Sequence, residues 1–192
     1  TCVKPSGTVS QLCDTASGIH ARHNHHYVRT VRIDKKDPVY EMFLAAGMPM
    51  EDDMMKPHTS AVVSYAQTAP AHAVTRNQMT AIEQLETWLI YQRHWCEHKP
   101  SVTISVGDDE WDTVGKWVYE NFDELSGVSF LPRVDHTYQQ APYQDKTKEE
   151  LDAWIAANPA PHIDWKMLSH FEKDDNTVGM QTLACTAGVC EI

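Results

Sequence analysis

The stretch "SVTISVGDDEWDTVGKWVYENFDELSGVSFLP", residues 101–132, predicts the class of the fold. It begins with a β-branched run at 101–106 and ends with a second apolar run at 127–132, and both runs are typical of strands. A helix is expected between them, because Asp108 is a favourable N-cap and apolar residues then recur at helical spacing. These apolar residues are Trp111, Val114, Val118 and Phe122. A strand, a helix and a strand in this order predict an α/β fold.

The chain before residue 101 continues the alternation of strands and helices. Strands are expected at 28–33 and 60–66, and a short helix is expected at 37–46, between a capping aspartate and a closing glycine. The most regular helix is expected to begin at Thr75, where Thr-Arg-Asn-Gln has the spacing of a capping box, and to be bounded by Pro100. Its apolar stripe would consist of Met79, Ile82, Leu85 and Leu89.

Beyond residue 132 the pattern becomes more polar. We expect a polar loop at 135–146 and then a short helix that is capped by Thr147 and Glu150 and ends before Pro159. After Phe171 the apolar periodicity fades, which is typical of a mobile tail. The whole pattern predicts an α/β fold with a polar C-terminal tail.

Composition and charge exclude several classes of function. A chain of 192 residues is long enough for one domain with a sizeable core. The formal net charge of -11 argues against a nucleic-acid polymer as partner, because such binding needs concentrated Lys and Arg. The nearest basic patch is interpreted as solvated faces of a strand and a turn: Arg22, Arg29, Arg32, Lys35 and Lys36. The sequence contains no run of about 18 apolar residues, so no membrane span is predicted.

The cysteines and the start of the chain suggest its setting. The count of five cysteines is odd, and the wide spacing of Cys2, Cys13 and Cys96 does not fit a secreted disulfide framework, so we expect a cytoplasmic protein. The chain opens with neither a signal peptide nor an initiator methionine. We therefore expect Thr1 to be a cut end.

The segment "KPSGTVSQL", residues 4–12, has the makings of an anion site. Backbone N–H groups in a glycine-containing turn before a helix point at a bound anion, and the helix dipole adds partial positive charge. Gly7 would let the backbone approach the ligand closely, and Lys4 could add a charge. The hydroxyl donors would be Ser6, Thr8 and Ser10. The segment is not a Walker A loop, because no Gly-Lys-Ser/Thr follows, and a turn without a ligand is the alternative.

Several blocks of the chain resemble one family when they are taken in order. They are "CVKPSGTVSQL", "SGIHARHNHHYVRTVRI", "EHKPSVTISV", "GVSFLP", "APYQ" and the ending "LACTAGVCEI". Together they are similar to the last quarter of the large chain of adenosylcobalamin-dependent (class II) ribonucleotide reductases, in the ribonucleoside-triphosphate reductase branch. The resemblance implies a C-terminal segment of a ten-stranded α/β barrel, with an incomplete barrel at 1–172 and a flexible redox-active tail at 173–192.

The resemblance also implies roles. In the family the opening loop holds the phosphates of the substrate through backbone amides and hydroxyls, which implies this role for Ser6, Gly7, Thr8, Val9 and Ser10. The family uses adenosylcobalamin and a radical mechanism to convert ribonucleotides to deoxyribonucleotides for DNA replication. Its Asn-x-Cys-x-Glu segment does not occur here. The isolated chain is therefore expected to be inactive, to bind no cofactor tightly and to need the remainder of the reductase chain.

Severing a barrel has a structural cost. Barrel strands cut from their neighbours leave an unpaired edge and exposed apolar faces. We therefore expect the isolated segment to form a homodimer or to adopt a rearranged packing. A stand-alone phosphate- or nucleotide-binding protein without chemistry is the alternative function.

Cys185 and Cys190 lie in a glycine-containing segment at the end of the chain. Two thiols at this spacing on a flexible tail can form a disulfide and exchange with another dithiol. In the family, C-terminal cysteines carry reducing equivalents into the active site, which implies thiol exchange with a thioredoxin-type reductant here. Two incidental thiols, or half of a zinc site that lacks partners, are the alternatives.

Two groups of histidines suggest metal sites. The first comprises His20, His23, His25 and His26, which we interpret as titratable surface histidines of a polar loop, with a substrate- or cobalamin-facing role as the alternative. The second, "HWCEH", matches a zinc-protease pattern, so a zinc hydrolase using His94, Glu97 and His98 is a further alternative, with Glu172 as the third ligand. Against it, Pro100 bounds the helix, which would put His98 in the last turn.

Overall fold

The computed structural model describes residues 1–7, 9–133 and 138–173. The chain divides into two compact units, one formed by Thr1–Val31 and Ser64–Ala157 and the other by Arg32–Val63 and Asn158–Ile192. None of the helices in the described ranges is long and apolar enough to cross a membrane. The expected boundary between a barrel part and a tail after residue 172 stays a prediction, because residues 174–192 lie outside these ranges.

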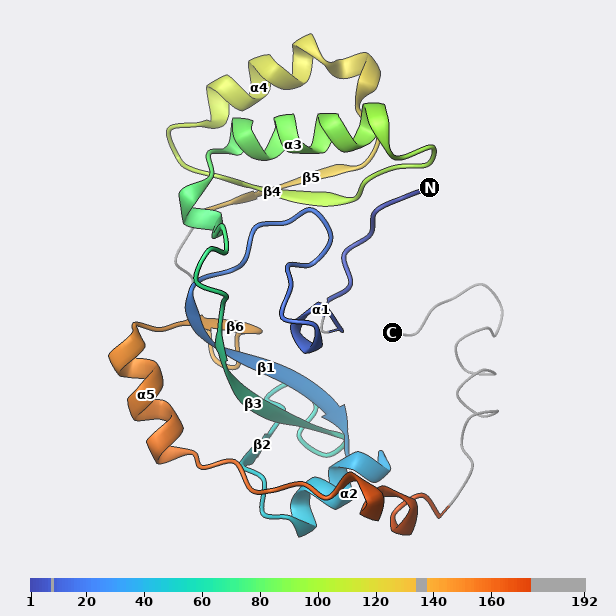
Figure 1. The fold of residues 1–192 in the computed structure, drawn as a ribbon, viewed down its shortest axis with the longest axis vertical. Helices are drawn as coiled ribbons and strands as arrows, with labels where there is room; N and C mark the ends of the chain where they lie inside the picture. The colour runs from blue at the N-terminus through green and yellow to red at the C-terminus, as the bar shows by residue number, and fades with distance from the viewer. Residues whose placement is uncertain (8, 134–137, 174–192) are drawn as a thin grey trace. The chain divides into compact units, whose positions relative to one another are not determined.

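The strand–helix–strand pattern at 101–132 is confirmed. Strands β4 (Val102–Val106) and β5 (Val128–Pro132) pair in parallel, and helix α4 (Trp111–Glu120) connects them. A parallel pair needs such a crossover, since a tight turn can join only antiparallel strands. Figure 1 shows α4 and helix α3 (Ala81–His94) over the same face of this pair.

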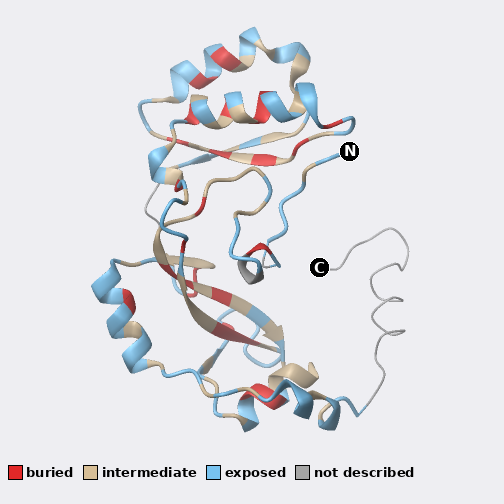
Figure 2. Cartoon of the chain, viewed as in Figure 1, coloured by how far each residue is buried: buried red, intermediate tan, exposed pale blue. Residues whose placement is uncertain are grey.

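The core of the first unit lies between these helices and the strand pair. Burial alternates along β4, where Val102, Ile104 and Val106 are buried and the residues between them are less so, as expected for a strand with one face against helices. The helices add Ala81, Leu85, Trp88 and Leu89 from α3 and Val114 and Trp117 from α4. Figure 2 shows buried segments of both helices in red. The apolar periodicity therefore predicted the core-facing side of α3 correctly at Leu85 and Leu89.

The predicted start of α3 at Thr75 is wrong. A capping box does form between Thr75 and Gln78, but it closes only a short 3-10 helix, η1 (Arg76–Gln78). Met79 is extended, and a second capping box between Thr80 and Glu83 then begins the α-helix. Two boxes in succession have the same sequence signature, so spacing alone could not tell which one starts the long helix.

The predicted cap and stripe of α4 also need correction. The N-cap residue is Glu110 and not Asp108, and Trp111 and Phe122 are 40% and 70% exposed. The carboxylate of Glu110 accepts hydrogen bonds from the N–H groups of Gly107 (2.7 Å) and Ala81 (2.8 Å). The carboxylate thus ties the start of α4 to the start of α3, and Val114 and Trp117 are the buried core residues of α4.

A four-stranded sheet has the order β2-β3-β1-β6. The predicted strands are confirmed as β1 (His26–Asp34) and β3 (Ser60–Thr68), and β2 (Met50–Asp52) pairs antiparallel with β3. Strand β6 (Tyr143–Asp145) pairs antiparallel with β1, within what was expected to be a polar loop. Three residues are too few for a periodic signal, so this strand could be found only from its partner.

The remaining elements follow local signals. Helix α2 (Pro38–Ala45) begins at Asp37, whose carboxylate accepts from Val39 N–H at 2.9 Å, and Gly47 has the expected positive φ of 75° beyond its end. Helix α5 (Lys148–Ala157) has the predicted cap between Thr147 and Glu150. Short helices complete the described chain: α1 (Val9–Leu12), η2 (Phe122–Glu124) and η3 (Trp165–His170). The α/β class is confirmed, and the ten-stranded barrel stays a prediction.

Candidate phosphate-binding site

The opening loop presents two neighbouring backbone amides to one acceptor. The N–H groups of Ser6 and Gly7 both donate to Ser17 Oγ, at 3.0 and 3.2 Å. Gly7 makes this geometry accessible because its φ of 59° lies in the left-handed region. Successive N–H groups that converge in this way form a concave donor site for an anion.

The other predicted loop residues are less open. Ser10 is buried, with its hydroxyl donating to Gly7 O at 3.0 Å, and Val9 N–H donates to Ser6 O at 3.3 Å. Lys4 Nζ donates to Ser101 Oγ at 2.9 Å. Thr8 lies outside the described residues. In the described loop, the two amides that share one acceptor are therefore those of Ser6 and Gly7.

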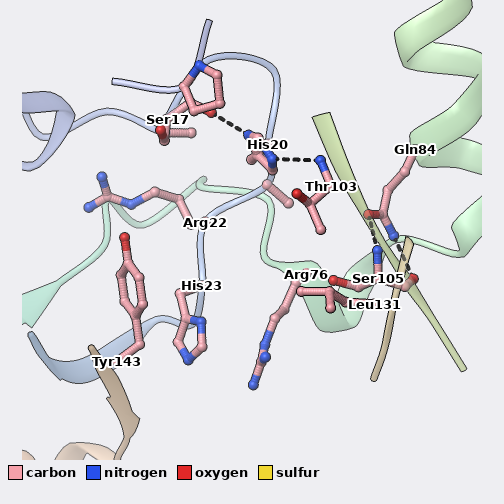
Figure 3. Close-up of a pocket in the computed structure, with 13 residues that line it drawn as sticks. Ser17, His20, Arg22, His23, Arg76, Gln84, Thr103, Ser105, Leu131 and Tyr143 are labelled. Atoms are coloured by element: carbon pink, nitrogen blue, oxygen red, sulfur yellow. Dashed lines mark hydrogen bonds between the residues drawn. The ribbon is translucent and has the colours of Figure 1, made fainter. Parts of the chain in front are cut away.

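Ser17 connects these amides to a cavity of about 380 Å³. The polar side chains that line it include Ser17, His20, Arg22, His23, Arg76 and Tyr143, several of which are labelled in Figure 3. Pro5 of the opening loop also belongs to the wall. The cavity thus joins the loop to two guanidinium groups.

Arg22 is a wall residue that sequence reasoning misjudged. It was expected on a solvated face, but it is only 4% exposed, with Nη1 donating to Thr15 O at 2.6 Å and Nη2 to Asp14 at 2.7 Å. Its backbone bridges to Thr75, 53 positions along the chain by residue number. That long-range pairing buries the side chain, and a local sequence pattern carries no signal for it.

Arg76 and His23 share the carboxylate of Asp145. Arg76 Nη2 lies 3.0 Å from Oδ2, and His23 Nε2 lies 2.6 Å from Oδ1. The His23 ring stacks on Tyr143 with centroids 4.6 Å apart, and the guanidinium of Arg29 lies 4.4 Å from the centroid of the Tyr143 ring. These contacts fix one wall of the cavity.

The His20 ring contacts the backbone of Ser17 and of Thr103. Its Nδ1 lies 2.7 Å from Ser17 O, and its Nε2 lies 3.0 Å from Thr103 N (Figure 3). Because Thr103 N–H can only donate, Nε2 accepts and the proton sits on Nδ1. The interpretation of His20 and His23 as surface histidines is therefore wrong, because both are half-buried parts of the cavity wall.

The zinc-hydrolase alternative fails on geometry. Helix α3 ends at His94, so His98 lies beyond it and does not share a helix face with His94. Instead, His98 N–H donates to Thr1 O at 3.1 Å. Within the described ranges, no group of three His, Cys, Asp or Glu side chains is arranged to hold a metal ion.

The structure describes three of the five cysteines. Cys2 and Cys13 are exposed free thiols, and Cys96 is a buried one. Cys185 and Cys190, the predicted thiol-exchange pair, lie outside the described residues. The pair stays a prediction.

The environment of His23 predicts a dependence of stability on pH. Burial, aided by the charge of Arg76 and opposed by Asp145, lowers the pKa of His23 from 6.5 to about 4. The unfolded chain therefore binds a proton more readily between these values, and the free energy of unfolding is expected to fall as the pH drops from 6.5 to 4. The loss is on the order of 3 kcal/mol at pH 4. When the free energy of unfolding is measured in urea at several pH values between 4 and 6.5, it should fall less steeply with decreasing pH in His23→Gln than in the unaltered chain. An equal dependence on pH in both proteins would contradict the lowered pKa of His23.

Comparisons with known proteins show that this chain is similar to a segment of several reductases. It is 31% identical to the adenosylcobalamin-dependent ribonucleoside-triphosphate reductase of Euglena gracilis over 157 residues, which are 81% of this chain and 22% of the relative. It is 30% identical over 174 residues to a probable enzyme of the same name in Dictyostelium discoideum, covering 88% of this chain and 23% of the relative. The Lactobacillus gasseri reductase is 27% identical over 199 residues, 100% of this chain and 26% of the relative.

A solved structure shares the fold. The crystal structure of a B-12 dependent (class II) ribonucleotide reductase matches with a TM-score of 0.70 at 24% identity, over 90% of this chain and 24% of that one. No protein-family model matches. The chain thus spans about a quarter of the length of the relatives that it matches.

Proposed function

We propose, because this chain is homologous to a segment of the adenosylcobalamin-dependent ribonucleoside-triphosphate reductases, that it supplies the substrate-phosphate loop of a ribonucleotide reductase. Ser6, Gly7, Thr8, Val9 and Ser10 form that loop, and the amides of Ser6 and Gly7 are its principal donors. The remainder of the reductase chain would supply the radical chemistry, and this segment would orient the nucleotide.

The convergence of the two amides on one oxygen supports this role above all. The Ser6 and Gly7 N–H groups lie 3.0 and 3.2 Å from Ser17 Oγ, which are ordinary distances for donation to an oxygen acceptor. A phosphate oxygen is an acceptor of the same kind and carries a negative charge, which strengthens such bonds. The loop is therefore preorganised to receive an anion.

The charge of the cavity wall supports the same role. Arg22 and Arg76 place two guanidinium groups on a wall of a chain whose formal net charge is -11. Each has a carboxylate partner, Asp14 or Asp145, but the Nε atom of each arginine is buried with no hydrogen-bond partner among the described residues. Buried N–H groups favour an acceptor, and a phosphate supplies several.

Cobalamin is not assigned to this cavity. Its volume of about 380 Å³ and its lining of guanidinium, imidazole and hydroxyl groups suit a phosphate and do not suit the broad face of a corrin ring. The absence of a tightly bound cofactor in this chain stays a prediction.

The proposal is tested by calorimetric titration of the chain with ATP. Arg76→Met is expected to weaken binding about fivefold to tenfold, because a charged donor to phosphate is lost. Arg93→Met is the matched control: Arg93 also pairs with a carboxylate, Glu124, but it lies on α3 and does not line the cavity. No heat of binding with the unaltered chain, or equal losses in both variants, would contradict the proposed function.

The terminal cysteines are proposed to serve the same enzyme by thiol exchange. Cys185 and Cys190 would form a disulfide that a thioredoxin-type dithiol reduces, with two electrons passing to the disulfide and two protons taken up by the thiolates. Mass spectrometry under oxidising conditions is expected to show the disulfide and its loss on addition of reduced thioredoxin. Free thiols at both positions after oxidation would argue against this role.

A further inference from the structure

We infer that the hydroxyl oxygen of Ser17 occupies the position of a ligand phosphate oxygen and competes with the ligand for the loop amides. This inference rests on the proposed function of the loop. It makes Ser17 a residue that sets the affinity of the site, although it lies outside the loop itself.

The hydrogen bonds to Ser17 carry the inference. Both the Ser6 and the Gly7 N–H groups end on Ser17 Oγ, at 3.0 and 3.2 Å. Each N–H has a single hydrogen, so neither can be fully shared between Ser17 and a phosphate oxygen. A ligand that uses these amides must therefore displace the Ser17 hydroxyl.

Ser17 shares its cavity with two cationic side chains. Ser17 lines the same cavity as Arg22 and Arg76. Arg22 is 4% exposed, and its Nε, like that of Arg76, is buried with no partner among the described residues. An anion that replaced the hydroxyl would therefore share the cavity with two cationic side chains, which already pair with Asp14 and Asp145 but keep unpartnered Nε–H groups among the described residues.

Displacement needs only a rotation of the Ser17 side chain. The carbonyl oxygen of Ser17 accepts from His20 Nδ1 at 2.7 Å and from His20 N at 3.2 Å, so the backbone is held independently of the hydroxyl. The hydroxyl can move to another staggered position around one single bond. In the absence of ligand it keeps the two amides converged, which preserves the shape of the site at some cost in affinity.

The test compares Ser17→Ala with the unaltered chain, using ATP and inorganic pyrophosphate as probes in calorimetry. Removal of the competing oxygen leaves two amides without an acceptor, so binding of both probes is expected to tighten about fivefold. The melting temperature without ligand is expected to fall, and the rise in melting temperature on adding pyrophosphate is expected to increase. Ser17→Thr keeps the hydroxyl and is expected to bind as the unaltered chain does.

Each outcome decides between competing roles for Ser17. Weaker or unchanged binding in Ser17→Ala, with clear binding by the unaltered chain, overturns the inference and leaves the proposed function standing. If neither protein binds either probe, the proposed function fails and the inference fails with it. If Ser17→Ala does not fold, Ser17→Cys is used instead, because sulfur is a weaker acceptor and is expected to tighten binding in the same direction.

Discussion

Replacing Gly7 with valine is expected to abolish binding of ATP to this chain. Gly7 has a φ of 59°, and a Cβ atom added there would meet no atom within 4 Å apart from those of its chain neighbours, so the expected cost comes from the backbone conformation and not from a contact of Cβ. The left-handed conformation is strongly disfavoured for a β-branched residue. The backbone would leave that region, and the amides of Ser6 and Gly7 would no longer converge. The valine side chain would also fill the open space over the loop, from which a phosphate can approach.

Gly47→Val provides the matched control for this experiment. Gly47 has a φ of 75° and equally open surroundings, but it lies beyond the end of α2 and outside the loop. Both variants are expected to lose stability by about 1–2 kcal/mol from backbone strain. Only Gly7→Val is expected to lose the calorimetric signal of ATP binding. The proposed role of the loop would be wrong if Gly7→Val bound ATP with unchanged affinity.

Removing the Trp88 side chain is expected to produce the largest loss of stability. Trp88 is fully buried at 0% exposure between α3 and the parallel strand pair, and its indole N–H donates to Pro100 O at 2.9 Å. Trp88→Ala would open a cavity and leave that carbonyl oxygen without a partner, at a cost of about 3–5 kcal/mol. The free energy of unfolding of a typical domain is about 5–15 kcal/mol, so this loss would remove a large part of the total stability.

Urea unfolding of Trp88→Ala should be compared with that of Trp95→Ala. Trp95 follows α3 at its C-cap and is 58% exposed, so its replacement is expected to cost less than about 1 kcal/mol. Trp88→Phe should fall between the two, because it keeps most of the apolar volume and loses the N–H donor. Similar midpoints for the two alanine variants would show that the core does not depend on Trp88.

Most elements of the fold were predictable because their signals are local. The β-branched run of β4, the cap of α2 at Asp37 and the cap of α5 at Thr147 each depend on residues a few positions apart, and each prediction was confirmed. The errors occurred where two local signals compete or none exists. The capping boxes at Thr75 and Thr80 are alike in sequence, and the short β6 is defined only by its pairing with β1.

Some features of the candidate site were likewise predictable from local sequence, and others were not. The sequence by itself determined the α/β class, the glycine turn at Gly7 and the resemblance to class II ribonucleotide reductases, because these depend on residue types in order along the chain. Only the tertiary structure decided that Ser17 Oγ meets the loop amides, that Arg22 is buried and that His20 accepts from Thr103, 83 residues away. The physical reason is that the free energy of these contacts depends on burial and on hydrogen-bond geometry between distant segments, which arise only once the chain has packed.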